Sequence, residues 1–260
     1  MTDTSMSNPP AHVPKIRSIT TDDVYAALKA GLSDFQRAPI YGLFFGAVFS
    51  VFGILMAVLL FYGDAGYWVL PLTAGFPLIG PFAAIGLYEV SRRLQAEEPL
   101  NWGGVLAAGF NSRSGQLPFF AVIAVFFLLV WIVIARVVFA VTFGTASMTN
   151  VMTSIEVFTT FEGLSMLVIG SVVGAALAGL LFSISVVGVP LLLDREIDVV
   201  TAMITSFKAT VENRGAMILW AIIIAATVVV ASLPLFLGMI LVFPMLGHSA
   251  WHLYRAVIEP

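Results

Sequence analysis

Six long apolar stretches make up most of this chain, and short segments that hold nearly all of the charged residues separate them. A helix needs about 20 mainly apolar residues to cross a hydrocarbon core of roughly 30 Å. The pattern therefore predicts an all-α, polytopic membrane helix bundle with six transmembrane helices, at residues 40–62, 67–90, 117–141, 164–193, 216–233 and 235–253. We expect residues 21–260 to form a single membrane domain and residues 1–20 to form a disordered cytoplasmic tail.

A repeated pattern precedes the first, third and fifth predicted spans. The stretches "DVYAALKAGL" (23–32), "NWGGVLAAGF" (101–110) and "DVVTAMITSF" (198–207) align without gaps. Each opens with Asp or Asn, which are good helix N-caps, and its apolar residues then recur at helical spacing. The sequence thus predicts three short amphipathic helices that lie at the cytoplasmic interface of the membrane.

A second pattern marks the return helices. The segments "FPLIG" (76–80), "VPLLL" (189–193) and "FPMLG" (243–247) each place a proline before further apolar residues. The predicted architecture is three hairpins, each made of an interfacial helix, an outward span and a proline-bearing return span. We expect kinks at Pro77, Pro81, Pro190 and Pro244, because proline removes a backbone hydrogen-bond donor from a helix.

The basic residues predict the orientation of these spans. Of the 12 Lys and Arg residues, 11 fall in the segments before spans one, three and five or after span six. Cytoplasmic loops of membrane proteins carry the excess of Lys and Arg. We therefore expect a multi-pass protein of the bacterial inner membrane with both termini in the cytoplasm.

Composition excludes several classes of function. The chain is 60% hydrophobic and only 10% charged, against about 45–50% and about 25% in an average soluble domain. It has no cysteine, which excludes disulfides, thiolate nucleophiles and Cys-based zinc sites. Its net charge is -3 and it has no basic run, so nucleic acid is not an expected partner.

Three longer motifs resemble a known family. They are "GFPLIGPFAAIGLYEVSRRL" (75–94), "VPLLLDREIDVVTAMITS" (189–206) and "VFPMLGHSAWHLYR" (242–255). Together they are similar to the bacterial integral membrane family catalogued as domain of unknown function 2189, and the likeness extends over nearly everything after about residue 35. The resemblance implies a polytopic inner-membrane protein, and it implies neither an activity nor a site.

Two histidines near the C-terminus are the first candidate site. His248 and His252 are four residues apart, so they share one face of a helix and could ligate a metal or a haem. The favoured interpretation is structural, because Trp251, Tyr254 and Arg255 form an aromatic and basic anchor at the headgroups. We expect no metal site and no cofactor.

Glu89 is the second candidate, and it could form a polar cluster with these histidines. A glutamate within hydrocarbon is costly and is a functional candidate by default. Glu89 also precedes Arg92 and Arg93 by three and four residues, which is the spacing of a helical ion pair. The pairing is the favoured interpretation, a proton-coupled role is the alternative, and a contact between Glu89 and a histidine of span six is a further expectation.

Arg136 is the basic residue that breaks the charge pattern, because it lies near the outer end of span three. We expect it to form an ion pair with Glu156 or Glu162 rather than to bind a substrate.

The sequence contains no phosphate-binding glycine loop, no nucleophile constellation and no paired carboxylates at catalytic spacing. It therefore predicts no catalytic residues and no enzyme. Two hypotheses remain: a non-catalytic scaffold, assembly factor or accessory subunit, and a small-solute or ion transporter. The first is favoured because few polar residues lie within the spans. The expected partners are the lipid bilayer and another membrane protein or further copies of this chain.

Overall fold

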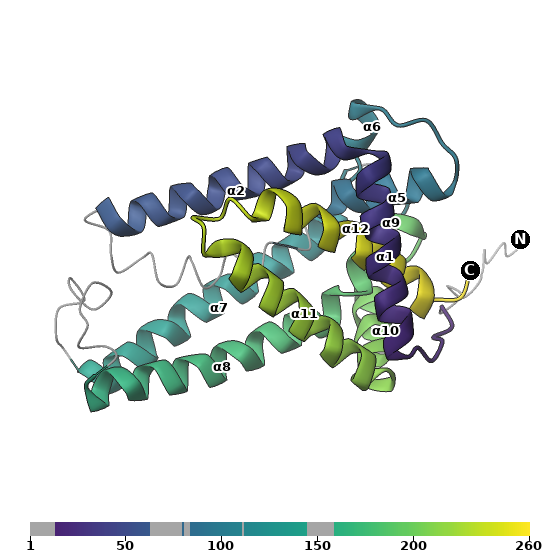
Figure 1. The fold of residues 1–260 in the computed structure, drawn as a ribbon. Coiled ribbons are helices and arrows are strands. Elements are labelled where there is room, and N and C mark those ends of the chain that lie inside the picture. Colours follow the sequence, from purple (N-terminus) through teal and green to yellow (C-terminus); the bar gives the residue numbers. More distant parts are fainter. Residues whose placement is uncertain (1–13, 63–79, 81–83, 111, 145–158) are drawn as a thin grey trace, which may run out of the picture.

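The computed structural model describes residues 14–62, 80, 84–110, 112–144 and 159–260. Its main elements are helices, and in the described residues the β-structure is limited to one bridge between Ile16 and Ile258. The helices, shown in Figure 1, are α1 (Thr21–Arg37), α2 (Pro39–Tyr62), α5 (Ile85–Gln95), α6 (Trp102–Leu106), α7 (Leu117–Phe143), α8 (Phe161–Ser185), α9 (Gly188–Asp194), α10 (Val199–Glu212), α11 (Arg214–Ser232) and α12 (Met239–Val257).

Four segments of the described chain are long and apolar enough to cross a membrane. They are Pro39–Val58, Leu117–Phe143, Phe161–Asp194 and Arg214–Ser232. In the most hydrophobic of them, Leu117–Phe143, only 17% of the apolar window is buried inside the protein. The outward side chains of this helix are therefore apolar, as expected of a surface that lipid covers.

These four segments correspond to the first, third, fourth and fifth predicted spans. Most of the second predicted span, residues 67–90, lies outside the described residues, and only its end is seen, as the beginning of α5. The sixth corresponds to α12, which is helical but is not apolar enough to qualify as a span by itself. Its second half carries His248, Ser249, His252 and Arg255, and ten of its residues are buried against other parts of the protein.

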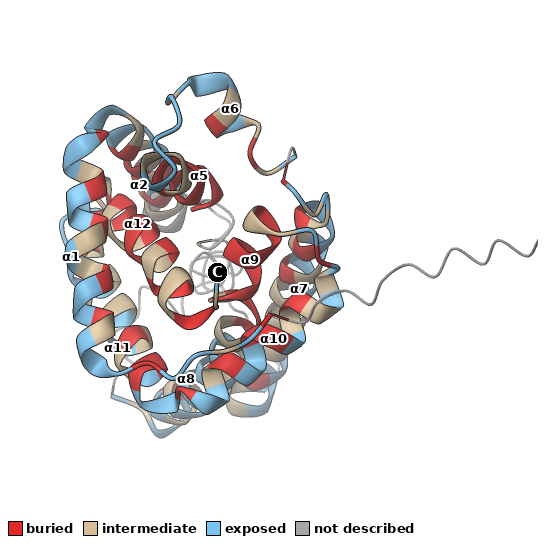
Figure 2. Cartoon of the chain, turned by 90° about the vertical axis from the view of Figure 1, so that its right-hand side faces the viewer, coloured by how far each residue is buried: buried red, intermediate tan, exposed pale blue. Residues whose placement is uncertain are grey.

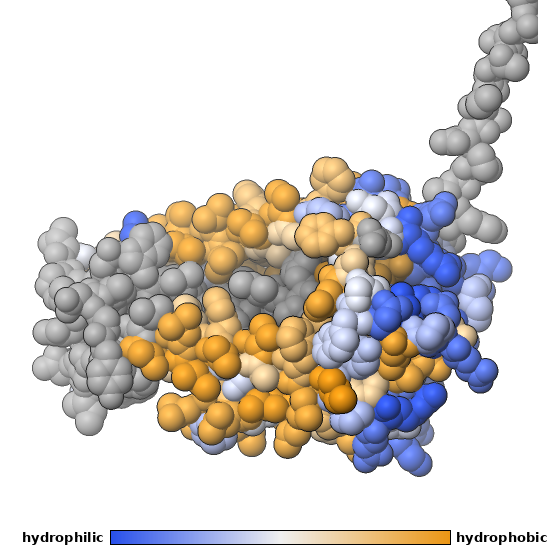
Figure 3. Space-filling view, turned by 90° about the horizontal axis from the view of Figure 1, so that it is seen from above, coloured by the Kyte–Doolittle hydropathy of each residue, from blue (hydrophilic) through white to orange (hydrophobic). Residues whose placement is uncertain are grey.

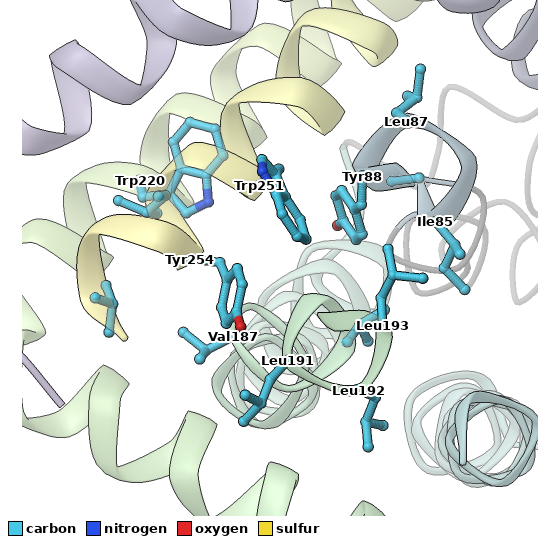
Figure 4. Close-up of a cluster of buried hydrophobic side chains, with 14 of the residues drawn as sticks. Ile85, Leu87, Tyr88, Val187, Leu191, Leu192, Leu193, Trp220, Trp251 and Tyr254 are labelled. Atoms are coloured by element: carbon cyan, nitrogen blue, oxygen red, sulfur yellow. The ribbon is translucent and has the colours of Figure 1, made fainter. Parts of the chain in front are cut away.

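Three segments that carry or follow a proline motif lie innermost. In α5 all residues from Ile85 to Ser91 are buried, and in α9 all residues from Gly188 to Leu193 are. Figure 2 shows these two helices and α12 inside the other helices, with most of their ribbon buried. Figure 4 shows how Tyr88, Leu193, Trp251 and Tyr254 from the three elements point toward a common core. The return segments therefore form the centre of the core, to which other helices add buried side chains such as Phe120 of α7 and Trp220 of α11.

The hydrophilic residues gather at one end of the bundle, as Figure 3 shows. We call this the polar end; it holds α1, α6, α10 and both ends of the described chain (Figure 1). The N-cap predictions for two of these helices are confirmed, since Asn101 accepts a hydrogen bond from Gly104 N and Asp198 accepts one from Thr201 N. In α1 the cap is instead Thr20, whose backbone N–H donates to the Asp23 carboxylate at 2.7 Å.

The second of these helices is shorter than the sequence pattern predicted. Helix α6 spans only five residues, and turns follow it up to Phe110. Glycine is a poor helix former, and this segment contains Gly103, Gly104 and Gly109.

The four prolines at which we expect kinks differ in their surroundings. Pro190 lies in α9, just after the helix is interrupted at Val186 and Val187, between α8 and α9. Pro244 lies inside α12 without ending it. Pro77 and Pro81 are outside the described residues.

The termini of the described chain meet at the polar end. Arg17 N donates to Val257 O at 2.7 Å, and Glu259 N donates to Lys15 O at 3.1 Å. Asn213, at the junction of α10 and α11, accepts a hydrogen bond from Ile19 N at 2.7 Å through its side chain. Lys15, Arg17 and Ile19, which belong to the predicted disordered tail at residues 1–20, are thus held by hydrogen bonds to distant parts of the chain. The first 13 residues of that tail lie outside the described part.

Candidate functional site

The two histidines of α12 have separate partners on two neighbouring helices. His248 is fully buried, and its Nδ1 lies 2.8 Å from Ser91 Oγ on α5. His252 is partly exposed, and its Nε2 lies 2.7 Å from Asp34 Oδ2 on α1. The sequence-predicted pair therefore sits between α1, α5 and α12 and links the three helices.

Close helix packing brings Asp34 to this position. The buried residues of α1 are Val24, Ala27, Gly31 and Asp34, which follow one another at helical spacing. A Cβ atom at Gly31 would overlap the backbone and hydroxyl of Ser249 on α12. Since glycine has no side chain, α1 approaches α12 closely enough for the Asp34 carboxylate to reach His252.

The environment of Asp34 favours its charged form. Burial raises the pKa of Asp34, but hydrogen bonds from His252 and Ser91 and the nearby imidazoles outweigh it and hold the pKa below its usual value. Arg37 is a weaker neighbour, with its Nη1 at 3.8 Å from Asp34 Oδ1. We call Asp34, Ser91, His248 and His252 the α1–α12 polar cluster.

Within the described part of the chain Glu89 does not join this cluster, because its carboxylate faces arginines of its own helix. Arg92 Nε donates to Glu89 Oε2 at 2.8 Å, and Arg93 Nε donates to Glu89 Oε1 at 2.6 Å. Arg92 also holds Glu98 through Nη1 at 2.9 Å and Nη2 at 2.7 Å. The ion pairs that the helical spacing predicted are present, and the expected contact with a histidine is taken by Asp34 and Ser91 instead.

The predicted ion pair of Arg136 falls partly outside the described residues. Arg136 is exposed on α7, and Glu162 is exposed in the first turn of the neighbouring α8. Glu156 is outside the described part of the chain, so this pairing stays a prediction.

The metal hypothesis can be compared with the geometry of the described residues. Within them, no group of three or more His, Asp or Glu side chains is placed to hold a metal ion. The rings of His248 and His252 each have a hydrogen-bonded partner of their own. The structural interpretation of the two histidines stays the prediction, and ligation of a metal or haem stays its untested alternative.

Comparison with known proteins gives one match. Residues 69–194 match a family model described as "Predicted integral membrane protein (DUF2189)". Over these residues the chain matches family DUF2189. The protein is thus an integral membrane protein with several apolar helices. No curated protein and no solved structure matches the chain.

The DUF2189 match is shorter than the likeness that the sequence motifs indicated. It contains the first motif and the beginning of the second, but it ends before the third at residues 242–255. Glu89 and Ser91 lie inside the DUF2189 segment, whereas Asp34, His248 and His252 lie outside it. The α1–α12 polar cluster therefore joins the matched segment to the parts of the chain on either side.

Sequence reasoning missed Asp34 and Ser91. One signal for Asp34 was available, because it continues the spacing of Val24, Ala27 and Gly31 on the apolar face of α1. A carboxylate on such a face needs a partner within the protein. Ser91 had no comparable signal, since a serine is common on any helix surface.

The α1–α12 polar cluster holds a charged carboxylate, that of Asp34, within hydrogen-bond distance of the His252 imidazole. The cluster holds helices together, because each hydrogen bond in it joins two different helices: Ser91 of α5 to His248 of α12, and Asp34 of α1 to His252 of α12. The cluster thus fastens α1 across the end of α12.

Proposed function

We propose that this protein is a non-catalytic scaffold, assembly factor or accessory subunit of the bacterial inner membrane, with its polar end in the cytoplasmic leaflet. The observation that carries the proposal is the closed core of the polar end. Large side chains that are fully buried fill it, among them Leu87, Leu191, Leu192, Trp251, Leu253 and Tyr254. A path for a polar solute normally needs several polar groups along it, and this core supports a static role instead.

The charged groups at the polar end also favour a static role. Glu89, Asp34 and Asp194 each have at least one cationic or imidazole partner within 3.1 Å. Tyr254 donates a further hydrogen bond to Asp194 at 2.8 Å. The pairs of Asp34 and Asp194 fix α1 and α9 relative to α12, whereas the Glu89 pair lies within α5.

The outward faces of the short helices support a position in the membrane interface. On α10 the residues Val200, Ile204, Phe207 and Val211 recur at helical spacing and are between 45% and 59% exposed. On the α6 segment Trp102, Leu106 and Phe110 are exposed as well. An apolar helix face beside a polar protein surface suits the boundary between headgroups and acyl chains. This supports the predicted interfacial helices and, with the clustered basic residues, a cytoplasmic location.

The proposal is tested by purifying the protein from its native membrane in mild detergent and weighing the intact complex. A scaffold or accessory subunit is expected to emerge with a fixed stoichiometry of one defined membrane protein, or as a defined homo-oligomer. Isolated protein in vesicles should then conduct no solute above the level of protein-free vesicles. A monomer that alone drives solute uptake would contradict the proposal.

One observation favours the second candidate, a small-solute or ion transporter. His248 is completely buried, and its Nε2 has no hydrogen-bond partner among the described residues. Buried ionisable groups in membrane proteins often serve proton relays. Proton-coupled uptake would be abolished by His248→Gln and Asp34→Asn, and Glu89→Gln would report whether the separate ion-pair network takes part.

A further inference from the structure

A second polar region lies on the other side of α5 from the α1–α12 polar cluster. It is a pocket of about 290 Å³ lined by Glu89, Arg92, Arg93, Glu98, Gly104, Ala108, Arg113 and Leu193. We call it the arginine pocket. It lies where α5, α6 and the segment before α7 meet the end of α9, so parts of the chain that are far apart in sequence form its walls.

The charges of the arginine pocket do not balance. Glu89 and Glu98 are neutralised by Arg92 and Arg93, since Arg92 contacts both carboxylates and Arg93 contacts Glu89. Arg113 also lines the pocket, and no ion pair within 4.0 Å engages its side chain in the described structure. The pocket therefore carries one positive charge in excess, and Arg113 supplies it.

The position of Arg113 is fixed by its backbone. Its N–H lies 3.5 Å from Leu193 O, and the Ser114 hydroxyl donates to Leu192 O at 2.7 Å. These bonds occupy carbonyls at the end of α9, which have no donors within the helix. The backbone of Arg113 is thus held against the end of α9, and its side chain lines the pocket from there.

Gly104 of α6 forms part of the opposite wall and leaves room there for the side chain of Arg93. A Cβ atom at this position would overlap the guanidinium of Arg93. Because glycine leaves this space free, Arg93 lies against the α6 backbone, with its Nη1 donating to Pro99 O at 3.0 Å. Arg93, which these contacts hold in place, and Arg113 then border a pocket in which the carboxylates are already paired.

The surroundings of the arginine pocket place it near lipid. Trp102 of α6 packs on Tyr41 and Phe44 of α2, with ring centroids 4.2 Å and 5.1 Å apart. Trp102 is 38% exposed and Leu106 is 53% exposed. Tryptophan and tyrosine gather at the headgroup level of a bilayer, and basic pockets at that level bind anionic headgroups.

We propose that the arginine pocket binds a singly charged phosphate group, as found in the phosphodiester of an anionic phospholipid or in the monoanion of inorganic phosphate. Arg113 and Arg93 donate hydrogen bonds to the phosphate oxygens, and the one excess charge of the pocket matches the one charge of a phosphodiester. The paired Glu89 and Glu98 keep the arginines in place and disfavour ligands of higher negative charge.

The test measures binding to the full-length protein after removal of bound lipid. Three probes are titrated separately: phosphatidylglycerol, phosphatidylcholine as a zwitterionic control, and inorganic phosphate. Retention is read by native mass spectrometry for the lipids, and the shift in melting temperature is read for phosphate. Arg113→Gln removes the unpaired cation, and Lys208→Gln, an exposed cation of the same polar end on α10, controls for net charge.

The expected result is saturable binding that weakens about tenfold in Arg113→Gln and stays unchanged in Lys208→Gln. If this holds for phosphatidylglycerol, the source is a lipid headgroup; if it holds for inorganic phosphate alone, the source is a soluble phosphate. Equal binding of both lipids by wild-type protein and Arg113→Gln, with no effect of phosphate, would overturn the proposal. A melting temperature of Arg113→Gln equal to that of wild type without ligand excludes misfolding.

Discussion

At the scale of single residues, the structure is organised by polar side chains whose partners lie on other helices. Asp34 reaches His252 across 218 residues of sequence, and Asn213 reaches Ile19 across 194. Such partners cannot be found from local spacing. The sequence predicted the ion pairs of Glu89 with Arg92 and Arg93 because they lie within one helical turn of each other.

Asp34→Asn tests the α1–α12 polar cluster. The change keeps the shape of the side chain but removes the charge that His252 and Ser91 stabilise. We expect a loss of about 2 kcal/mol in the free energy of unfolding at neutral pH, because hydrogen bonds to charged groups are worth about 1.5–3 kcal/mol. Thermal unfolding in detergent measures it, and Asp22→Asn, an exposed aspartate of the same helix, is the control.

The difference in the free energy of unfolding between wild type and Asp34→Asn should also depend on pH. The pKa of Asp34 is lower in the folded protein than its usual value, so its contribution is complete above pH about 4 and is lost as the pH falls through the folded pKa. The difference in stability between wild type and Asp34→Asn should therefore shrink on acidification. A difference that grew as the pH fell would contradict this assignment of the charge.

At the scale of elements, helices were easier to predict than their ends and their breaks. Asn101 and Asp198 cap their helices as expected, because a cap needs only residues within the same turn. The long predicted span over residues 164–193 contained a break that the sequence indicated only through Pro190. The structure places this break at Val186 and Val187, where the Ser206 hydroxyl of α10 accepts the hydrogen bond of Val187 N in place of a helical carbonyl.

Ser206→Ala tests this break. The Ser206 hydroxyl donates to Ser183 O at 2.7 Å and accepts from Val187 N at 3.1 Å, so it joins both sides of the gap between α8 and α9. Its removal leaves a buried N–H without a partner, which costs about 1–3 kcal/mol. Chemical unfolding should show this loss.

Ser183→Ala is the matched control for that experiment. Among the described residues the Ser183 hydroxyl bonds only to Gly179 O of its own helix, and Ser183 is only partly buried. Its removal should change stability by less than about 0.5 kcal/mol. Equal losses in the two variants would show that Ser206 has no special role at the break.

At the scale of the whole molecule, composition and charge predicted an all-helical membrane protein, and the helices and the family match agree with that. The number of spans could not be predicted as surely. Helix α12 has a polar second half that the protein itself buries, and hydropathy alone cannot tell such a helix from one that faces lipid. The sequence also could not show that the proline-bearing segments lie innermost, because this depends on how distant helices pack.

We propose that the polar end of the protein lies in the cytoplasmic headgroup region, with the outer face of α10 in lipid. The chain has no cysteine, so a fluorophore can be attached at one position without a background. Ile204→Cys lies on the exposed apolar face of α10, and Glu212→Cys is an exposed polar position at the end of the same helix.

The decisive measurement is quenching of these two labels in reconstituted vesicles, by spin-labelled lipids and by aqueous iodide. If the outer face of α10 lies in lipid, lipid-borne quenchers at shallow acyl positions quench the label at position 204, whereas iodide quenches the label at position 212. Iodide quenching of both labels to the same extent, with no effect of the lipid-borne quenchers, would contradict the placement of α10 in the headgroup region.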